Sequence, residues 1–184
     1  MSEREEAQQR RRAREFEAFV AGATGRLLHA ATLLTAEPAD ANPRAQRLLA
    51  AALTTTYARW ESLRGEDPYD RTRQALATRF ARGSWHHRPR RGPRHGGPLE
   101  VLGPRARLIV VLRLYEGIPQ EQTAALLGLP ERRVRTLCAR AVARVYEDTR
   151  ARERAEAETR ERESGSGGPL ERGPGAGSRP VAAP

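Results

Sequence analysis

Residues 119–140 carry the side chains whose types and spacing are most informative about chemistry. In the run PQEQTAALLGLPERRVRTLCAR, Ala124 is followed four positions later by Gly128, and Val134 comes six positions after that. A small residue lets two helices approach closely, a glycine permits a turn with positive φ, and an apolar residue fills the gap between the helices. This spacing is typical of a helix-turn-helix that reads DNA.

Arginines crowd the second helix of this motif: Arg132, Arg133, Arg135 and Arg140. A guanidinium group forms paired hydrogen bonds to guanine O6 and N7 and to phosphate oxygens, so such a helix suits the major groove. The alternative is an ordinary helical hairpin with a solvated basic face. The combined spacing and charge favour DNA reading.

The whole chain is strongly basic. It has 184 residues, a formal net charge of +10 and a pI near 11.2, and all 33 basic side chains are arginine. This excess favours a nucleic acid or an acidic lipid as partner, but it does not decide the fold. Cys138 has no second cysteine to pair with, the apolar runs are too short to span a membrane, and the N-terminus is charged. We therefore expect a cytoplasmic protein without a membrane partner.

Apolar residues recur at steps of three and four, and no stretch alternates with period two, so the predicted fold class is all-α. In the N-terminal half, helices are expected over 15–34, 44–63 and 69–81. In the C-terminal half, 106–116 fits a strand or a helix, and its length and neighbours favour a helix. The second motif helix is expected to run to about Tyr146. Residues 150–163 alternate arginine with glutamate; they are a candidate for a solvated extension of that helix and cannot bury a core.

Changes in composition predict five segments. A charged extension over 1–13 either lengthens the first helix or stays loose. A three-helix domain over 14–83 is followed by a basic flexible linker over 84–103 that is rich in glycine and proline. The helix-turn-helix domain covers 104–147, and 148–184 is a charged and then Gly/Pro-rich tail that is expected to be disordered.

A second basic segment, 79–95, is a candidate surface for single-stranded nucleic acid. It has six arginines and no acid, and Phe80 and Trp85 interrupt it. Arginines can follow a phosphate backbone while an aromatic ring stacks on an unpaired base. The alternative is a solvated charge run with both rings packed inward; the sequence favours packing for Phe80 and stacking for Trp85.

No set of residues suited to catalysis can be assembled. His86, His87 and His95 lie in a Gly/Pro/Arg-rich stretch and lack the paired spacing of a zinc site. Cys138 shares a helical stripe with apolar residues, so a small buried side chain is its expected role. We expect no enzymatic activity, no metal, no cofactor and no small-molecule substrate.

The order of these parts resembles the compact, extracytoplasmic-function type of bacterial sigma factor. Residues 104–145 closely resemble its DNA-reading fourth region, and 15–35, 57–63 and 67–91 look like its second region. The resemblance implies an initiation factor whose partners are RNA polymerase core and promoter DNA. Its N-terminal domain would read the −10 element and its C-terminal domain the −35 element, and an anti-sigma protein is a further partner to consider.

The resemblance also implies roles for individual residues. The −35 helix would span 131–143. The implied contacts with −35 DNA are made by Arg132, Arg133, Arg135, Thr136, Arg140 and Gln120. The implied contacts with the −10 element are made by Arg79, Arg82, Trp85 and Arg88. The implied contacts with polymerase are made by Leu48, Leu49, Leu53 and Tyr57.

One departure from the family pattern concerns polymerase docking. Arg44, Arg47 and Ala51 stand where relatives carry acidic or amide side chains. The change removes electrostatic complementarity to a basic polymerase surface, and opposed like charges can cost several kcal/mol. Two alternatives follow: a sigma-derived DNA-binding regulator with impaired docking, and an interaction protein that binds an anti-sigma-like partner.

Overall fold

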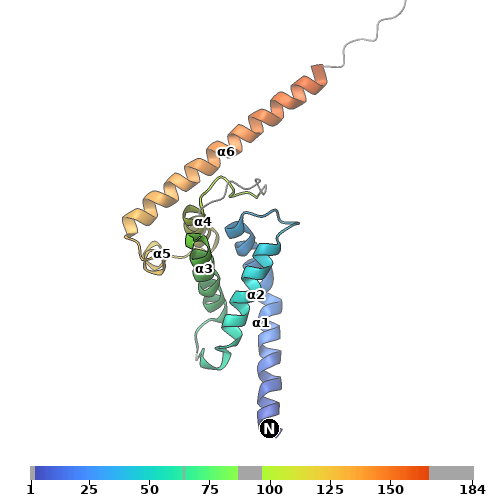
Figure 1. The fold of residues 1–184 in the computed structure, drawn as a ribbon, viewed down its shortest axis with the longest axis vertical. Helices are drawn as coiled ribbons and strands as arrows, with labels where there is room; N and C mark the ends of the chain where they lie inside the picture. Colours follow the sequence, from blue (N-terminus) through green and yellow to red (C-terminus); the bar gives the residue numbers. More distant parts are fainter. Residues whose placement is uncertain (1–2, 64, 87–96, 166–184) are drawn as a thin grey trace, which may run out of the picture. The chain divides into compact units, whose positions relative to one another are not determined.

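The computed structural model describes residues 3–63, 65–86 and 97–165, and all regular secondary structure in these ranges is helical (Figure 1). The all-α prediction is therefore confirmed. Residues up to Glu147 form one compact unit, and the described residues from Asp148 onward belong to a second. The elements in chain order are α1 (Glu3–Thr35), α2 (Pro43–Tyr57), the 3-10 turn η1 (Trp60–Ser62), α3 (Pro68–His86), α4 (Pro104–Val110), the π-helical turn η2 (Val111–Tyr115), α5 (Gln120–Leu127) and α6 (Glu131–Gly165).

The helix ends depart from the sequence prediction at several places. The charged extension lengthens α1, whose first turn carries three acidic residues that suit the positive end of a helix dipole. The second helix ends at Tyr57 rather than at position 63, because the chain tightens into η1. The third runs five residues past Ala81 to His86, so residues 84–86 are helical although composition predicts a linker from position 84.

The last helix, α6, runs well past Tyr146. Its outer part, in the second unit, is stabilised by neighbouring charges of opposite sign at i and i+4. Arg152 contacts Asp148 at 2.8 Å, and Arg160 contacts Glu156 at 3.5 Å. The helical extension over 150–163 is thus observed, and its described side chains are exposed.

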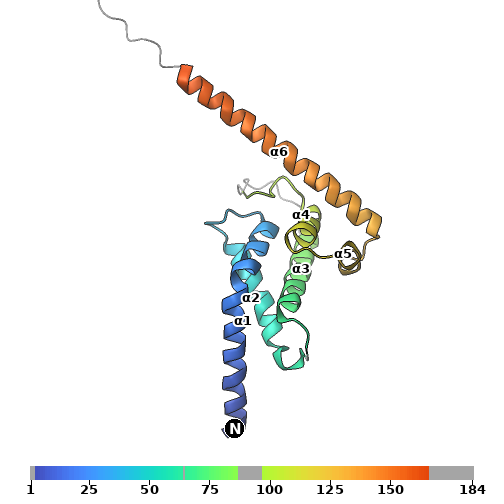
Figure 2. The ribbon, with the colours of Figure 1, turned by 180° about the vertical axis from the view of Figure 1, so that it is seen from behind.

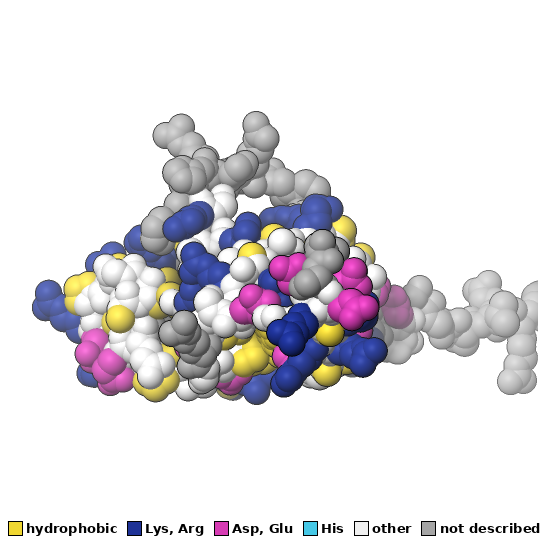
Figure 3. Space-filling model, turned by 90° about the horizontal axis from the view of Figure 1, so that it is seen from below, with side chains coloured by type: hydrophobic (Ala, Val, Ile, Leu, Met, Phe, Trp, Pro, Cys, Tyr) yellow, Lys and Arg dark blue, Asp and Glu magenta, His cyan; other side chains and the backbone are white. Residues whose placement is uncertain are grey.

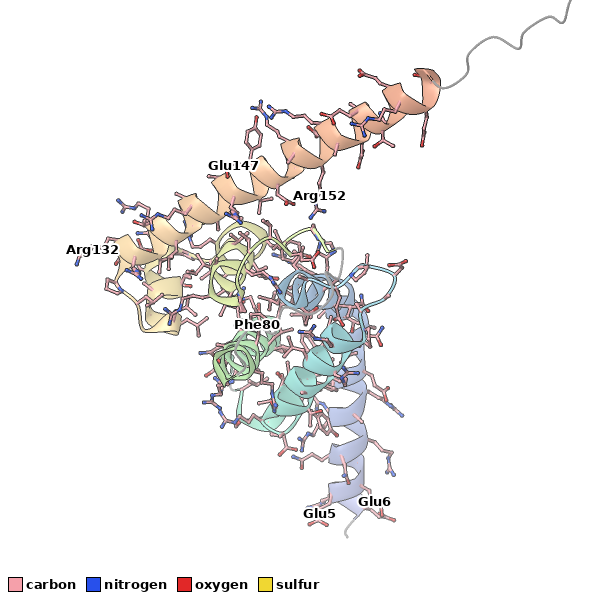
Figure 4. All side chains as sticks on the ribbon, turned by 45° about the horizontal axis from the view of Figure 1, so that its top comes forward. Glu5, Glu6, Phe80, Arg132, Glu147 and Arg152 are labelled. Carbon is pink, nitrogen blue, oxygen red and sulfur yellow. The ribbon has the colours of Figure 1, made fainter. Side chains whose placement is uncertain are left out.

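A continuous apolar core joins helices of both halves within the first unit. Helices α1 and α2 lie side by side in both views, and α3 packs against them (Figures 1 and 2). Phe80 of α3 is 9% exposed and points in among the helices (Figure 4), so the packing alternative holds for this ring. Leu99 and Leu102, within the segment predicted to be a linker, are buried in the same core.

Two polar contacts tie the C-terminal half to α1 and α3. Arg107 of α4 donates to the Leu34 carbonyl in the last turn of α1 and to the Leu102 carbonyl, each at 2.8 Å. Helix ends leave carbonyls without partners, so an arginine there supplies a missing donor. Burial, with a smaller contribution from the nearby charge of Arg44, lowers the pKa of Arg107 to about 10, and the group stays protonated at neutral pH.

The second contact centres on the buried carboxylate of Glu116. Both of its oxygens lie 3.0 Å from the Tyr69 hydroxyl, and Arg26 of α1 and Arg73 of α3 approach to 3.6 and 3.8 Å. Burial, the charge of Glu116 and the hydrogen bond to it raise the pKa of Tyr69, in that order. Tyr115 stacks on His29 of α1, so the same region has aromatic contact as well.

The side chain of Glu37, which precedes α2 in the chain, caps the N-terminus of this helix. Asn42, at the N-cap position, makes no capping hydrogen bond, and the Glu37 carboxylate instead accepts from the backbone N–H groups of Arg44 at 3.1 Å and Ala45 at 2.8 Å. Burial raises the pKa of Glu37, but the hydrogen bonds from the Ala45 and Arg44 backbone and the Thr35 side chain, together with the charge of Arg44, outweigh it, and the net shift is downward from 4.5.

This cap makes stability depend on pH. Because the folded pKa of Glu37 lies below the ordinary value, its contribution is present above that value and is lost as the pH falls through the folded pKa. We expect Glu37→Gln to lower the free energy of unfolding by about 1 kcal/mol at pH 7. The difference from wild type should shrink in acid, as measured by urea unfolding across the pH range. Glu17→Gln, at an exposed position of α1, is the control, and an equal loss at every pH would contradict the capping role.

Candidate nucleic-acid interface

The helix-turn-helix is formed by α5 and α6 with Gly128 at the turn. Gly128 has φ +62°, the left-handed conformation that glycine adopts at least cost. The next N–H, that of Leu129, donates to the Ala124 carbonyl at 3.0 Å, which closes the end of α5. The predicted role of Gly128 is confirmed.

The two helices meet on a small apolar cluster. Val134 is 0% exposed and packs with Ala124 of α5 and Ile109 of α4. Leu127, Leu129, Leu137 and Cys138 are half-buried around it. The predictions that Ala124 allows close approach and that Val134 fills the gap are confirmed, and Ile109 extends the cluster to a third helix.

The exposed side of α6 carries the candidate DNA-reading residues. Successive residues of a helix turn by about 100°, so Arg132 and Thr136, each two positions from Val134, lie on the opposite side from it. Both are exposed, and Arg132 projects from the start of α6 (Figure 4). The Thr136 hydroxyl donates to the Arg132 carbonyl at 2.9 Å, and its oxygen can still accept a hydrogen bond.

The other candidate residues flank this stripe. On the side facing α5, Arg135 donates to Gln120 at 3.4 Å, and Gln120 donates to Glu131 at 3.4 Å. On the side facing α4, Arg133 and Arg140 line a groove of about 580 Å³. The structure thus places Gln120 in the first turn of α5 and the other five sequence-predicted residues in the first three turns of α6.

Sequence reasoning missed one residue at this surface. Arg105 of α4 lines the same groove as Arg133 and Arg140. No spacing rule relates Arg105 to α6, because the contact arises only when the two helices pack together.

Elsewhere, Figure 3 shows acidic and basic side chains interspersed on the face seen from below, with hydrophobic side chains in small patches.

The candidate −10 residues are described only in part. Arg79 and Arg82 are exposed on α3, and Arg79 donates to the Thr55 hydroxyl of α2 at 2.8 Å. The backbone of Trp85 lies in the last turn of α3, but its side chain is outside the described part of the structure, as is the whole of Arg88.

The candidate docking residues do not share one exposed face. Leu49 is 4% exposed and belongs to the core. Leu48 and Leu53 are half-buried against that core, and the ring of Tyr57 packs on Phe16 of α1 with the Arg12 guanidinium 4.4 Å from its centre. The exposed side of α2 carries Arg47 instead.

Other site chemistry is sparse among the described residues. Within these ranges, no three histidine, cysteine, aspartate or glutamate side chains gather as metal ligands, and no helix has the length and apolar character needed to span a bilayer. His87 and His95 lie outside the described residues. Cys138 is half-buried; burial raises the pKa of its thiol, and the charge of Arg113 opposes that rise.

The exposed side of α6 depends on the packing of the apolar cluster beneath it. We expect Val134→Ala to lower the free energy of unfolding by about 2 kcal/mol, because it leaves a cavity between three helices. Val142→Ala, on the same helix but 45% exposed, is a matched control and should change stability by less than about 0.5 kcal/mol. Urea unfolding followed by tryptophan fluorescence measures both; similar losses in the two variants would contradict a packing role for Val134.

Comparison with known proteins now identifies the family. Residues 99–147 match the model of sigma-70 region 4, which covers the helix-turn-helix and the segment of Leu99 and Leu102. The RNA polymerase sigma-E factor of Streptomyces coelicolor is 32% identical over 160 residues, which covers 76% of this chain and 88% of the relative. Those of Streptomyces avermitilis and Streptomyces antibioticus are 31% and 32% identical, and the matches cover 76% of this chain and 87% of each relative. No solved structure matches the chain. The predicted resemblance is confirmed, and the chain belongs to the family of RNA polymerase sigma factors.

Proposed function

We propose that this sigma factor directs RNA polymerase core to promoters by reading the −35 element with the exposed side of α6. The observation that carries the proposal is the two-sided character of this helix. Val134 and Ala141 are buried on one side, and Arg132 and Thr136 are exposed on the other. A helix held in this way presents a fixed row of donors and acceptors to the major groove.

The position of each side chain suggests its role. Arg132, at the centre of the exposed stripe, suits paired hydrogen bonds to guanine, and Thr136 offers an acceptor and a methyl group to neighbouring bases. Arg133, Arg135 and Arg140, on the flanks, suit phosphates of the two strands. Gln120 holds the Arg135 side chain by a hydrogen bond and adds a polar group from the start of α5.

On the N-terminal side, we assign −10 recognition to the exposed arginines of α3, Arg79 and Arg82, together with Trp85 and Arg88. Arginines beside an aromatic residue suit an unpaired strand. We assign polymerase docking to α2, with Leu48, Leu53 and Tyr57 bordering the contact and Leu49 supporting it from the core. The cytoplasm is the proposed location, since that is where bacterial polymerase acts.

Reconstituted transcription tests the proposal directly. The full chain is added to core polymerase from the native cell together with a library of genomic fragments, and transcript starts are mapped. The expected result is a set of start sites that share one sequence element near −35 and that are absent without the chain. If no start site depends on the chain, the proposal is wrong.

The role of Arg132 is tested by substitution. We expect Arg132→Ala to weaken binding to the best −35 duplex by about 1–3 kcal/mol and to relax preference at one base pair, because a paired contact to a base is lost. Binding to a set of duplexes that differ by single base pairs measures both effects. Arg10→Ala, an exposed arginine of α1, should change neither. A loss of the same size on every duplex would make Arg132 a backbone contact.

A second function, a DNA-binding regulator with weakened polymerase docking, is favoured by the exposed basic side of α2. If a basic polymerase surface faces α2, Arg47→Glu should strengthen binding of the chain to core polymerase by reversing a repulsion. Arg59→Glu, exposed beyond the end of α2, is the control for general charge effects. Strong binding by wild type that is lost in Arg47→Glu would indicate instead that Arg47 contacts an acidic partner surface.

A further inference from the structure

The groove between α4 and α6 extends the reading surface beyond the two motif helices. Its volume is about 580 Å³, and four guanidinium groups line it: Arg105 from α4 and Arg132, Arg133 and Arg140 from α6. Leu129, Pro130 and Leu137 form its apolar lining, and Thr136 is its uncharged polar residue. No carboxylate is among the described residues that line the groove, so its chemistry is that of an anion site.

The ligand chemistry that best fits such a lining is phosphate. Arginine forms paired, charge-assisted hydrogen bonds with phosphate oxygens, and several arginines around one hollow reinforce each other. The start of α6 borders the groove at Pro130 and Arg132, so the positive end of the helix dipole adds to the same potential. The phosphate could belong to a polynucleotide backbone or to a free nucleotide.

The position of the groove favours the polynucleotide. Arg132 and Thr136 lie both in the groove lining and on the outward stripe of α6. A duplex whose bases meet that stripe therefore brings one of its backbones toward Arg133, Arg140 and Arg105. A free nucleotide would contact the groove alone, without the additional contacts that a duplex makes with the outward stripe of α6.

Arg105 lies on the exposed side of α4. Arg107 is directed inward, where it donates to the carbonyls of Leu34 and Leu102. Residues two apart lie on different sides of a helix, so anchoring Arg107 keeps the exposed Arg105 on the outer side.

We propose that Arg105 is a DNA-backbone contact of this sigma factor: with Arg133 and Arg140 it holds a phosphate of one strand while Arg132 and Thr136 meet the bases. The proposal rests on the function proposed above for α6. It adds a positioning residue from outside the helix-turn-helix, one that sets affinity and register and leaves base preference unchanged.

The experiment measures binding of the full chain to two duplexes, one selected by the chain from random oligonucleotides and one scrambled, over a range of salt concentrations. Arg105→Ala should weaken binding to both duplexes by the same factor, about tenfold at moderate salt. The slope of log K against log salt should become shallower by about 0.9, the value for one phosphate contact. Arg105→Lys, which keeps the charge, should restore the slope, and Arg10→Ala should leave affinity and slope as in wild type. Thermal unfolding of each variant verifies that the fold is intact.

Three results would overturn the proposal. An unchanged slope in Arg105→Ala would remove Arg105 from the interface, and a loss confined to the selected duplex would make it a base reader. Displacement of DNA by ATP at constant ionic strength, seen in wild type and absent in Arg105→Ala, would assign the groove to free nucleotides. If wild type showed no sequence preference, the proposed function of α6 would fail, but the salt slopes on the scrambled duplex would still test the phosphate contact.

Discussion

The buried carboxylate of Glu116 constrains how the helices of this sigma factor meet. A buried charge is costly unless it is paired and hydrogen-bonded. Here Tyr69 donates to it, and Arg26 and Arg73 lie nearby, so one acidic side chain from the end of η2 gathers partners from α1 and α3. Removing any partner leaves part of that charge uncompensated. The continuous apolar core supplies most of the burial, and the carboxylate adds polar contacts between the two halves.

The DNA-reading surface depends on this packing through α4. Arg107 caps the end of α1, and Ile109, two residues later, packs on Val134 of α6. The same short helix therefore contacts the N-terminal core and the reading helix, and it carries Arg105 on its outer side. Such a scaffold fixes the backbone positions from which the arginines of α4 and α6 extend.

Helix α2 is where the sequence predicts a departure from the family pattern, and its surface bears on the proposed docking to polymerase. Its apolar residues differ in burial: Leu49 is buried, whereas Leu48, Leu53 and Tyr57 are half-buried. The exposed Arg47 gives the remaining surface a positive charge. The proposed polymerase docking through α2 therefore depends on the borders of its apolar face, or on an acidic surface of the partner.

Much of this architecture follows from the sequence alone. Steps of three and four determine that the chain is helical, and the spacing of Ala124, Gly128 and Val134 determines the helix-turn-helix, because these residues act on neighbours within a few positions. The burial of Leu99 and Leu102, the capping of α2 by Glu37 and the approach of Arg105 to α6 were decided only by the tertiary structure. Each of these depends on contacts between segments that no local pattern relates, and the free energy of burying them together outweighs local composition.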